Sequence, residues 1–371
     1  MPTYADPEEG RAVPADALQA WTATLLERFG TPPDIAADVA EVLVAADRRA
    51  IASHGTARLP QYVALIEAGV MDPAARPELV RAKAAIGLFD AHNGWGHHAS
   101  RVAMDAAIEG ARQNGSYTAV VRDSNHFGIA GWYALRAADA GLIGLSLTNA
   151  SPLVAATRGI DPLVGTNPIA VAAPAGARAH FCLDMATSTI TRGRIEVAER
   201  RGETLQPGWA VDAQGRPTTE PAAALEGALL PLGGVEATGG YKGYGLTLLV
   251  DILTGVLAGG PAAPDIAPLF STHYGKSDLG QTFMAIDPDA LDEPGAFAAR
   301  LETELDLFTQ ARTAPGAPGP ILVPGEPEAA AERRSAQRGV AVDRGHHADL
   351  LELAARADVP FPASSPIGDR A

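Results

Sequence analysis

The chain has 371 residues, of which 47% are hydrophobic and 20% are charged. At this length, such a composition predicts a globular protein of about two domains and excludes a disordered chain. The formal net charge of −15 disfavours nucleic acid and anionic membrane surfaces as partners. The single cysteine, Cys182, excludes an internal disulfide and a multi-cysteine metal site, as is typical of a reducing compartment.

Neither the N-terminal segment nor the most apolar window of the sequence indicates export or membrane insertion. The first twenty residues contain no basic segment followed by an apolar one, so they predict no signal or transit peptide. The most apolar window, residues 245–260, contains Asp251 and is shorter than the roughly 20 apolar residues that a bilayer requires. We therefore expect a cytoplasmic protein without a membrane partner.

The N-terminal part of the chain is predicted to be helical. Over residues 14–69, apolar side chains recur at a spacing of three or four, as in Leu18, Trp21 and Leu25. From residue 84 onward, short apolar runs alternate with amphipathic stretches or loops rich in glycine and proline, which predicts a sheet of mixed direction.

The second half of the chain contains a long segment without predicted helices or strands, residues 202–240, which we call the excursion, and then further predicted helices. Residues 202–240 are rich in Gly and Pro but contain Trp209 and several leucines that need burial, so we expect an ordered excursion. An apolar helix follows, then a strand at 281–287, and helices at 288–312 and 327–338. A Pro/Gly hinge near residue 317 would let the last segment fold back onto the N-terminal helices.

Ser53, His54, Gly55 and Arg58 form the first candidate site, where the second helix is predicted to end. Histidine titrates near neutral pH, a neighbouring hydroxyl can orient its ring, and an arginine offers a bidentate contact to a carboxylate. Gly55 would permit a sharp backbone bend. The alternative is an ordinary helix C-terminus with a glycine cap and a surface arginine.

The segment from Ser124 to Gly128 is the second candidate, because it lies between a predicted strand and a predicted helix. Such turns collect at the edge of a sheet, where ligand sites are common, and would place His126 there. The alternative is a turn in which Asn125 and Gly128 are only conformational.

Three further segments are suited to binding phosphate or carboxylate groups. They are residues 165–168, 184–188 and 239–245, of which the last opens the apolar helix and contains Lys242. Glycines let backbone amides approach a ligand, and a helix N-terminus favours anions. Each signal is weak alone, but their order after the two histidine segments is hard to attribute to turns.

Residues 94–99 imitate a Rossmann dinucleotide fingerprint, because a predicted strand precedes them, a helix follows, and Asp123 comes later. Two features oppose this interpretation: four residues separate the strand from Gly94, and bulky Trp95 lies between the glycines. His92, His97 and His98 could bind a metal, but no recognisable ligand spacing accompanies them, so solvated histidines at a helix start are expected instead.

Six segments in chain order resemble the malate/L-lactate dehydrogenase family. They are SHGTARLPQYV (53–63), NHFGIAGWY (125–133), DPLVGTNPIAVAAP (161–174), DMATS (184–188), GGYKGYGL (239–246) and VPGEPE (323–328). The match extends over nearly the whole chain. The resemblance implies a nicotinamide-dependent oxidoreductase of α/β (α+β) class, whose cofactor domain is not a Rossmann fold but contains a mixed, largely antiparallel sheet.

The resemblance also implies how the chain is divided. A helical domain would be built from both termini, residues 1–82 and 288–371, around an NAD(P)-binding sheet domain of residues 83–287. The protein would be a homodimer with its active site near the domain cleft. The Rossmann-like segment then becomes an ordinary helix start, and Cys182 is a strand residue.

By motif, His54 would move a proton at the substrate oxygen with Ser53 orienting it, and Arg58 would bind the substrate carboxylate. His126 lies in the segment that lines the nicotinamide and has the acid/base role in some relatives, so the choice between the two histidines stays open. Other implied substrate contacts are Thr166, Thr187 and Ser188. Implied contacts to NAD or NADP are His126, Phe127, Gly128, Asp184, Met185, Ala186, Gly240, Lys242, Gly325, Glu326, Pro327 and Glu328; no metal is implied.

Two differences from the family's ketimine reductases bear on the substrate. The family's ketimine reductases carry an aspartate after glycine where this chain has Gly193-Arg194, and their lysine motif is closer to GGHKGSAL. The sequence thus predicts interconversion of a small 2-hydroxy acid, of malate, lactate or sulfolactate type, with its 2-oxo acid. Arg194 or Arg192 could bind a second carboxylate or be a solvated charge. Reduction of a cyclic ketimine is the alternative activity, and a non-catalytic nucleotide-binding protein is the alternative class.

Overall fold

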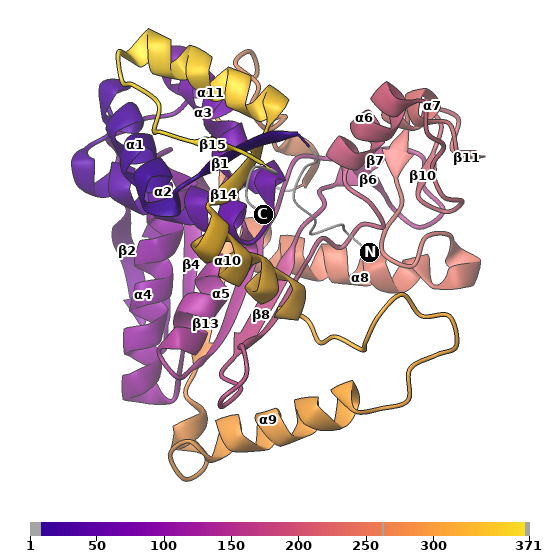
Figure 1. Ribbon diagram of the computed structural model, residues 1–371. Helices are drawn as coiled ribbons and strands as arrows, with labels where there is room; N and C mark the ends of the chain where they lie inside the picture. The colour runs from indigo at the N-terminus through magenta and orange to yellow at the C-terminus, as the bar shows by residue number, and fades with distance from the viewer. Residues whose placement is uncertain (1–8, 262, 368–371) are drawn as a thin grey trace.

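The computed structural model describes residues 9–261 and 263–367, and a seven-stranded sheet lies at its centre (Figure 1). Every neighbouring pair in this sheet is antiparallel except β3 and β4, which are parallel. The sheet is therefore mixed and largely antiparallel, as predicted, and differs from the parallel sheet of a Rossmann fold. Its order is β2 (Glu78–Lys83), β3 (Ile86–Asp90), β4 (Ser116–Ser124), β13 (Leu279–Ile286), β5 (Ile143–Thr148), β8 (Ile169–Ala173) and β9 (Phe181–Met185).

Two helices cover one face of this sheet. They are α4 (Gly96–Asn114), which starts at the Rossmann-like segment, and α5 (Ala130–Asp139). Phe283 of β13 joins both helices in one buried core. Neighbouring Thr282 points to the other face, as strand alternation requires, and donates a hydrogen bond to the Leu253 carbonyl. That face is thus covered by α8 (Gly240–Asp251) and the π-helical turn Ile252–Val256 that continues it.

Segments from both ends of the chain form a second core. The helices α1 (Ala15–Arg28), α2 (Pro33–Arg48), α3 (Leu59–Glu67) and α11 (Arg344–Ala357) surround it. Beside them β1 (Gly10–Val13) pairs with β14 (Val340–Asp343) and β15 (Ser365–Pro366). Figure 1 shows indigo and yellow segments side by side in this layer. The strand β1 was not expected from the sequence.

The proposed domain limits stay a prediction. The strand β2 straddles the limit after residue 82, and residues 1–8 and 368–371 lie outside the described residues. Beyond the other limit, α9 (Ala296–Thr309) packs through Leu305 against Ala175 and Val323, at the far end of the sheet from α11 (Figure 1).

The excursion is ordered, as predicted, and builds a small lobe with its own core. A five-stranded sheet in this lobe has the order β11 (Pro217–Thr218), β10 (Ala210–Val211), β12 (Ala228–Leu229), β6 (Val154–Ala155) and β7 (Pro162–Val164). The helices α6 (Arg192–Arg201) and α7 (Pro221–Leu225) cover it. The remaining elements are α10 (Glu326–Arg338) and the 3-10 turns Ala52–His54, Thr56–Arg58, Glu236–Thr238, Ala263–Asp265 and Pro288–Ala290.

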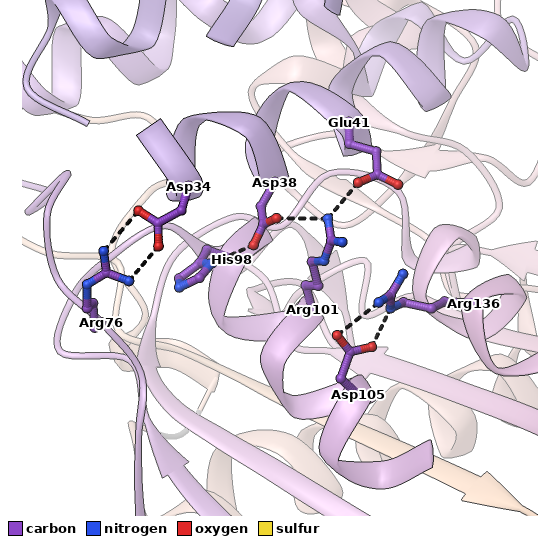
Figure 2. A network of polar contacts seen from close by, with 8 residues as sticks. All are labelled: Asp34, Asp38, Glu41, Arg76, His98, Arg101, Asp105 and Arg136. Carbon is purple, nitrogen blue, oxygen red and sulfur yellow. Dashed lines mark hydrogen bonds and ion pairs between the residues drawn. The ribbon is translucent and has the colours of Figure 1, made fainter. Parts of the chain in front are cut away.

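Polar contacts join α2 to α4 and α4 to α5 (Figure 2). Asp38 on α2 accepts from His98 Nδ1 at 2.7 Å and pairs with Arg101 at 2.8 Å, both on α4. Arg136 on α5 is paired with Asp105 on α4. The expectation that His97 and His98 are solvated was wrong, since they are 0% and 8% exposed. The reason is that α2 packs over the first turn of α4.

Candidate active site

The segment that carries His54 is shaped by a buried carboxylate. After α2 ends at Arg48, the chain forms two 3-10 turns, Ala52–His54 and Thr56–Arg58. Asp47 accepts hydrogen bonds from the Thr56 amide at 2.9 Å and the Thr56 hydroxyl at 2.6 Å. A Cβ at Gly55 would collide with the Asp47 carboxylate, whereas φ at Gly55 is −97°. Gly55 is therefore needed for close approach, not for the sharp bend that the sequence suggested.

The His54 ring is hydrogen-bonded to Ser53, and Ser53 is in turn bonded to Arg58. Ser53 Oγ is 2.9 Å from His54 Nδ1, and Arg58 Nε donates to the Ser53 carbonyl at 2.6 Å. Desolvation lowers the pKa of His54 to about 4, and the charge of Arg58 adds to the effect. A neutral imidazole beside a fixed cation can accept a proton from a substrate whose carboxylate the arginine binds.

His126 faces His54 across this site. It lies in the loop between β4 and α5, and the two ring centroids are 5.4 Å apart. Desolvation lowers the pKa of His126 well below its usual value, followed by the charges of His54, His97 and Arg58. The sequence-predicted residues Ser53, His54, Arg58 and His126 are thus brought together from two distant segments.

Phe270 is a part of this site that sequence reasoning missed. The guanidinium carbon of Arg58 lies 5.3 Å from the centroid of the Phe270 ring, and the His126 ring centroid is also 5.3 Å from it. Phe270 adopts φ of +62°, which is rare for an aromatic residue and suggests that the surrounding contacts hold it there. The ring makes one side of the site apolar, and no motif in the sequence marks it.

The strand β9 leads from the α5 N-terminus to the predicted substrate threonine. Asp184 accepts a hydrogen bond from the Gly131 amide at 2.7 Å. Desolvation raises the pKa of Asp184 to about 6, opposed by that amide and by Arg49. Cys182 is a buried strand residue, as predicted, and desolvation raises the pKa of its thiol to about 12.

Thr187 and Ser188 turn their hydroxyl groups into the protein. The Thr187 hydroxyl donates to the carbonyls of Thr166 and Asn167 at 3.0 and 3.1 Å and accepts from Thr247 on α8 at 2.7 Å. The Ser188 hydroxyl donates to the Ile190 carbonyl at 2.8 Å. These bonds place the loop of Thr166 beside that of Thr187, and the substrate contacts of all three residues stay a prediction.

Lys242 and Gly240 lie in the first turn of α8. Gly239, with φ of +99°, precedes this turn, and no side chain caps it. Lys242 is exposed, with its ammonium 5.8 Å from the centroid of the Tyr241 ring. The contact of Thr247 with Thr187 joins α8 to the end of β9. A helix N-terminus with an exposed lysine and no acidic side chain in its first turn is suited to a phosphate or carboxylate group.

The segment Gly325–Glu328 crosses the start of β9. The Cys182 amide donates to the Pro324 carbonyl at 3.1 Å, and a Cβ on Gly325 would lie 2.9 Å from the Cys182 nitrogen. Glu326 is paired with Arg178. A hollow of about 330 Å³ opens beside Gly325, with Trp132, Arg49 and Arg136 among its lining residues. The segments with Phe127, Gly131, Asp184 and Gly325 are therefore neighbours around the α5 N-terminus.

The two arginines considered for a second carboxylate have other contacts. Arg192 pairs with Glu196 at 3.2 Å, and the Arg194 guanidinium carbon lies 5.9 Å from the centroid of the Trp209 ring. Among the described residues, no group of three His, Cys, Asp or Glu side chains could hold a metal ion. No helix in residues 9–261 and 263–367 has the length and apolar character to cross a membrane.

Comparison with known proteins identifies the class. Residues 13–351 match the family model described as malate/L-lactate dehydrogenase. The chain is 41% identical over 305 residues to a malate dehydrogenase of Pyrococcus abyssi, covering 82% of this chain and 83% of that one. It is 37% identical to a Δ1-pyrroline-2-carboxylate reductase of Ancylobacter novellus, covering 82% and 86% of the two chains.

A solved structure agrees with these matches. Sulfolactate dehydrogenase from Methanocaldococcus jannaschii has a TM-score of 0.86 and 32% identity, covering 94% of this chain and 98% of that one. The chain is thus a dehydrogenase that acts on a CH–OH group. The chain belongs to the malate/L-lactate dehydrogenase family, whose dehydrogenases act on 2-hydroxy acids and use nicotinamide cofactors.

Proposed function

We propose that this protein interconverts a small 2-hydroxy acid and its 2-oxo acid, with NAD or NADP as the hydride carrier and His54 as the acid/base. The observation that carries the proposal is the grouping of Ser53, His54 and Arg58 within two short turns, opposite His126. One proton donor and one carboxylate-binding cation are what this chemistry requires from the protein.

Each of these side chains has a role in the proposed reaction. Arg58 binds the substrate carboxylate, and its contact with the Ser53 carbonyl fixes its direction. His54 then donates a proton to the 2-oxo oxygen as the adjacent carbon gains a hydride, and takes the proton back in the reverse reaction. Ser53 holds the ring through Nδ1. The apolar face of Phe270 excludes water from Arg58, which strengthens its attraction for a carboxylate.

The predicted cofactor residues suit a dinucleotide by their chemistry. The α8 N-terminus carries the exposed Lys242 and has no acidic side chain in its first turn, which suits an anionic pyrophosphate. The hollow beside Gly325 offers the flat surface of Trp132 to a planar ring. Its two arginines, Arg49 and Arg136, are paired with Glu332 and Asp105. When bound, the nicotinamide supplies and accepts the hydride. His126, Phe127 and Gly128 then line its reactive end.

A cyclic ketimine is the second candidate substrate, because a Δ1-pyrroline-2-carboxylate reductase is 37% identical to this chain. Arg194 stands where the resemblance to ketimine reductases calls for an aspartate. An assay of the purified chain with NADH or NADPH and a panel of 2-oxo acids and cyclic ketimines tests both candidates. Faster cofactor oxidation with an oxo acid supports the first candidate, and faster oxidation with a ketimine supports the second.

We further propose a homodimer formed through α8, in the cytoplasm. Tyr241, Leu249, Ile252 and Val256 leave about half of their surface exposed and lie on successive turns of α8 and its π-helical continuation. Ile252→Glu should convert a dimer into a monomer in light scattering after size exclusion. Leu307→Glu, at an exposed apolar residue of α9, is the matched control. An unchanged mass for Ile252→Glu would place the interface elsewhere.

A further inference from the structure

Tyr62 lies between two histidines from different elements. It is 1% exposed on α3, four residues beyond Arg58, and its hydroxyl lies 2.6 Å from Nδ1 of His126. The same hydroxyl lies 3.4 Å from Nε2 of His97, which is fully buried on α4. Its ring packs edge-on against Trp95, His97 and Phe270. Tyr62 therefore has little freedom to turn its hydroxyl elsewhere.

The donors around His126 decide which ring nitrogen carries its proton. The Gly128 amide donates to Nδ1 of His126 at 3.3 Å, and an amide can only donate. A hydrogen on Nδ1 would point at this N–H, so the amide favours a lone pair on Nδ1. At 3.3 Å this contact is weaker than the bond to Tyr62 at 2.6 Å, so the tautomer depends mainly on Tyr62. Tyr62, whose pKa desolvation raises, is protonated and gives its single hydrogen to the same nitrogen. The proton of a neutral His126 then resides on Nε2.

His97 completes the chain of bonds. Because the Tyr62 hydrogen points to His126, the Tyr62 oxygen can only accept from Nε2–H of His97. His97 Nδ1 is buried without a hydrogen-bond partner and is left with a lone pair rather than a hydrogen. Desolvation lowers the pKa of His97 to about 3, which keeps it neutral. The bonds therefore run in one direction, from His97 through Tyr62 to His126.

We propose that Tyr62, itself held by His97, is a positioning residue that keeps His126 in the Nε2–H tautomer, so that His126 offers the site a fixed hydrogen-bond donor while His54 carries the proton. This inference rests on the proposed function for its catalytic consequence. It answers the question that the motifs leave open, because His54 is bonded at Nδ1 to a hydroxyl that can donate or accept, whereas His126 receives two donors.

The tautomer can be observed in the protein without cofactor or substrate. Long-range ¹H–¹⁵N correlation spectra of histidine-labelled protein distinguish protonated from unprotonated ring nitrogens, and the His126 signals are assigned by their loss in His126→Gln. We expect Nδ1 to be unprotonated and Nε2 protonated in both His126 and His97. In Tyr62→Phe, the two His126 nitrogens should shift toward intermediate values. Tyr133→Phe removes another buried hydroxyl, bonded to the Phe127 carbonyl at 2.6 Å, and should leave the His126 tautomer unchanged.

Kinetics supply a second readout. Loss of one hydrogen bond that orients His126 should lower kcat of Tyr62→Phe by about tenfold, with little change in KM for the oxo acid that Arg58 binds. A hydrogen on Nδ1 of His126 in the unmodified protein would overturn the inference, and so would an unchanged tautomer in Tyr62→Phe. The wild-type spectrum requires neither a folded variant nor turnover, so failure of the proposed function would leave this test intact.

Discussion

The imidazole rings of His54 and His126 lie 5.4 Å apart, centroid to centroid, although His54 belongs to a turn between α2 and α3 and His126 to the loop between β4 and α5. The two rings differ in their hydrogen-bond partners. His54 Nδ1 contacts the hydroxyl of Ser53, which can donate or accept, whereas His126 Nδ1 receives two donors. This difference is the basis on which we propose that His54 transfers the proton and that His126 keeps a fixed orientation.

Substitution of His54 should remove most of the turnover. In His54→Ala no group remains to move a proton at the substrate oxygen, so kcat should fall by about 10²- to 10⁴-fold. Steady-state assays in both directions measure this, and cofactor binding, followed by fluorescence, should be retained because His54 contacts the substrate side. If His54→Ala kept the wild-type kcat, proton transfer would have to be reassigned to His126.

The pH dependence should follow the lowered pKa of His54. Oxidation of the hydroxy acid requires neutral His54, so kcat/KM for the free enzyme should fall only as the pH drops through about 4, not through the usual 6.5. Reduction requires protonated His54, so its kcat/KM should decrease about tenfold per pH unit above about 4. Measurement of kcat/KM against pH in both directions tests these two trends. A fall of kcat/KM for oxidation centred near pH 6.5 would contradict them.

Arg58→Lys should weaken substrate binding more than it slows turnover. Lysine cannot make the planar two-point contact with a carboxylate, and it loses the stacking on Phe270. We expect KM for the oxo acid to rise by about 10- to 100-fold with a smaller change in kcat. Arg76→Lys is the matched control, since Arg76 makes a two-point pair with Asp34 on the surface. Equal KM values for both variants would remove Arg58 from the carboxylate site.

The turn that presents His54 should tolerate no side chain at residue 55. Because a Cβ there would collide with the Asp47 carboxylate, Gly55→Ala should lower the free energy of unfolding by about 1–3 kcal/mol. Gly193→Ala, where a Cβ meets no atom within 4 Å, should change it by less than about 1 kcal/mol in the stabilising direction. Denaturant unfolding measures both, and equal stabilities would show that Asp47 moves freely.

Much of the fold can be predicted from local sequence patterns, and the elements that were not predicted have physical reasons. The spacing of three or four between apolar residues from Leu18 to Leu25 predicts α1, because one face of this helix is buried. The strand β2 was missed because all six of its residues are exposed at the sheet edge, so no alternation marks it. The strand β1 is four residues long and acquires its partner β14 from the far end of the chain.

The candidate site likewise contains residues that the sequence predicts and residues that only the structure reveals. Residue chemistry and motif allow Ser53, His54, Arg58 and His126 to be proposed from the sequence, because histidine and arginine side chains suit proton transfer and carboxylate binding. Tyr62 and His97 resemble ordinary core residues in the sequence, and only their placement around His126 distinguishes them. Two signals could have indicated Tyr62: it lies within the family motif of residues 53–63, and it follows Arg58 by four residues, a spacing at which helical residues share a face. Phe270 has no local signal, because its neighbours come from distant segments.

Hydride transfer to a 2-oxo acid is the central claim, and one measurement tests it most directly. Purified protein is mixed with NADH or NADPH and either oxaloacetate, pyruvate, sulfopyruvate or a cyclic ketimine, and the loss of cofactor absorbance is followed with the 2-hydroxy acid quantified as product. The account predicts oxidation of at least one cofactor with equimolar hydroxy acid, abolished in His54→Ala. No oxidation of either cofactor with any oxo acid would contradict it.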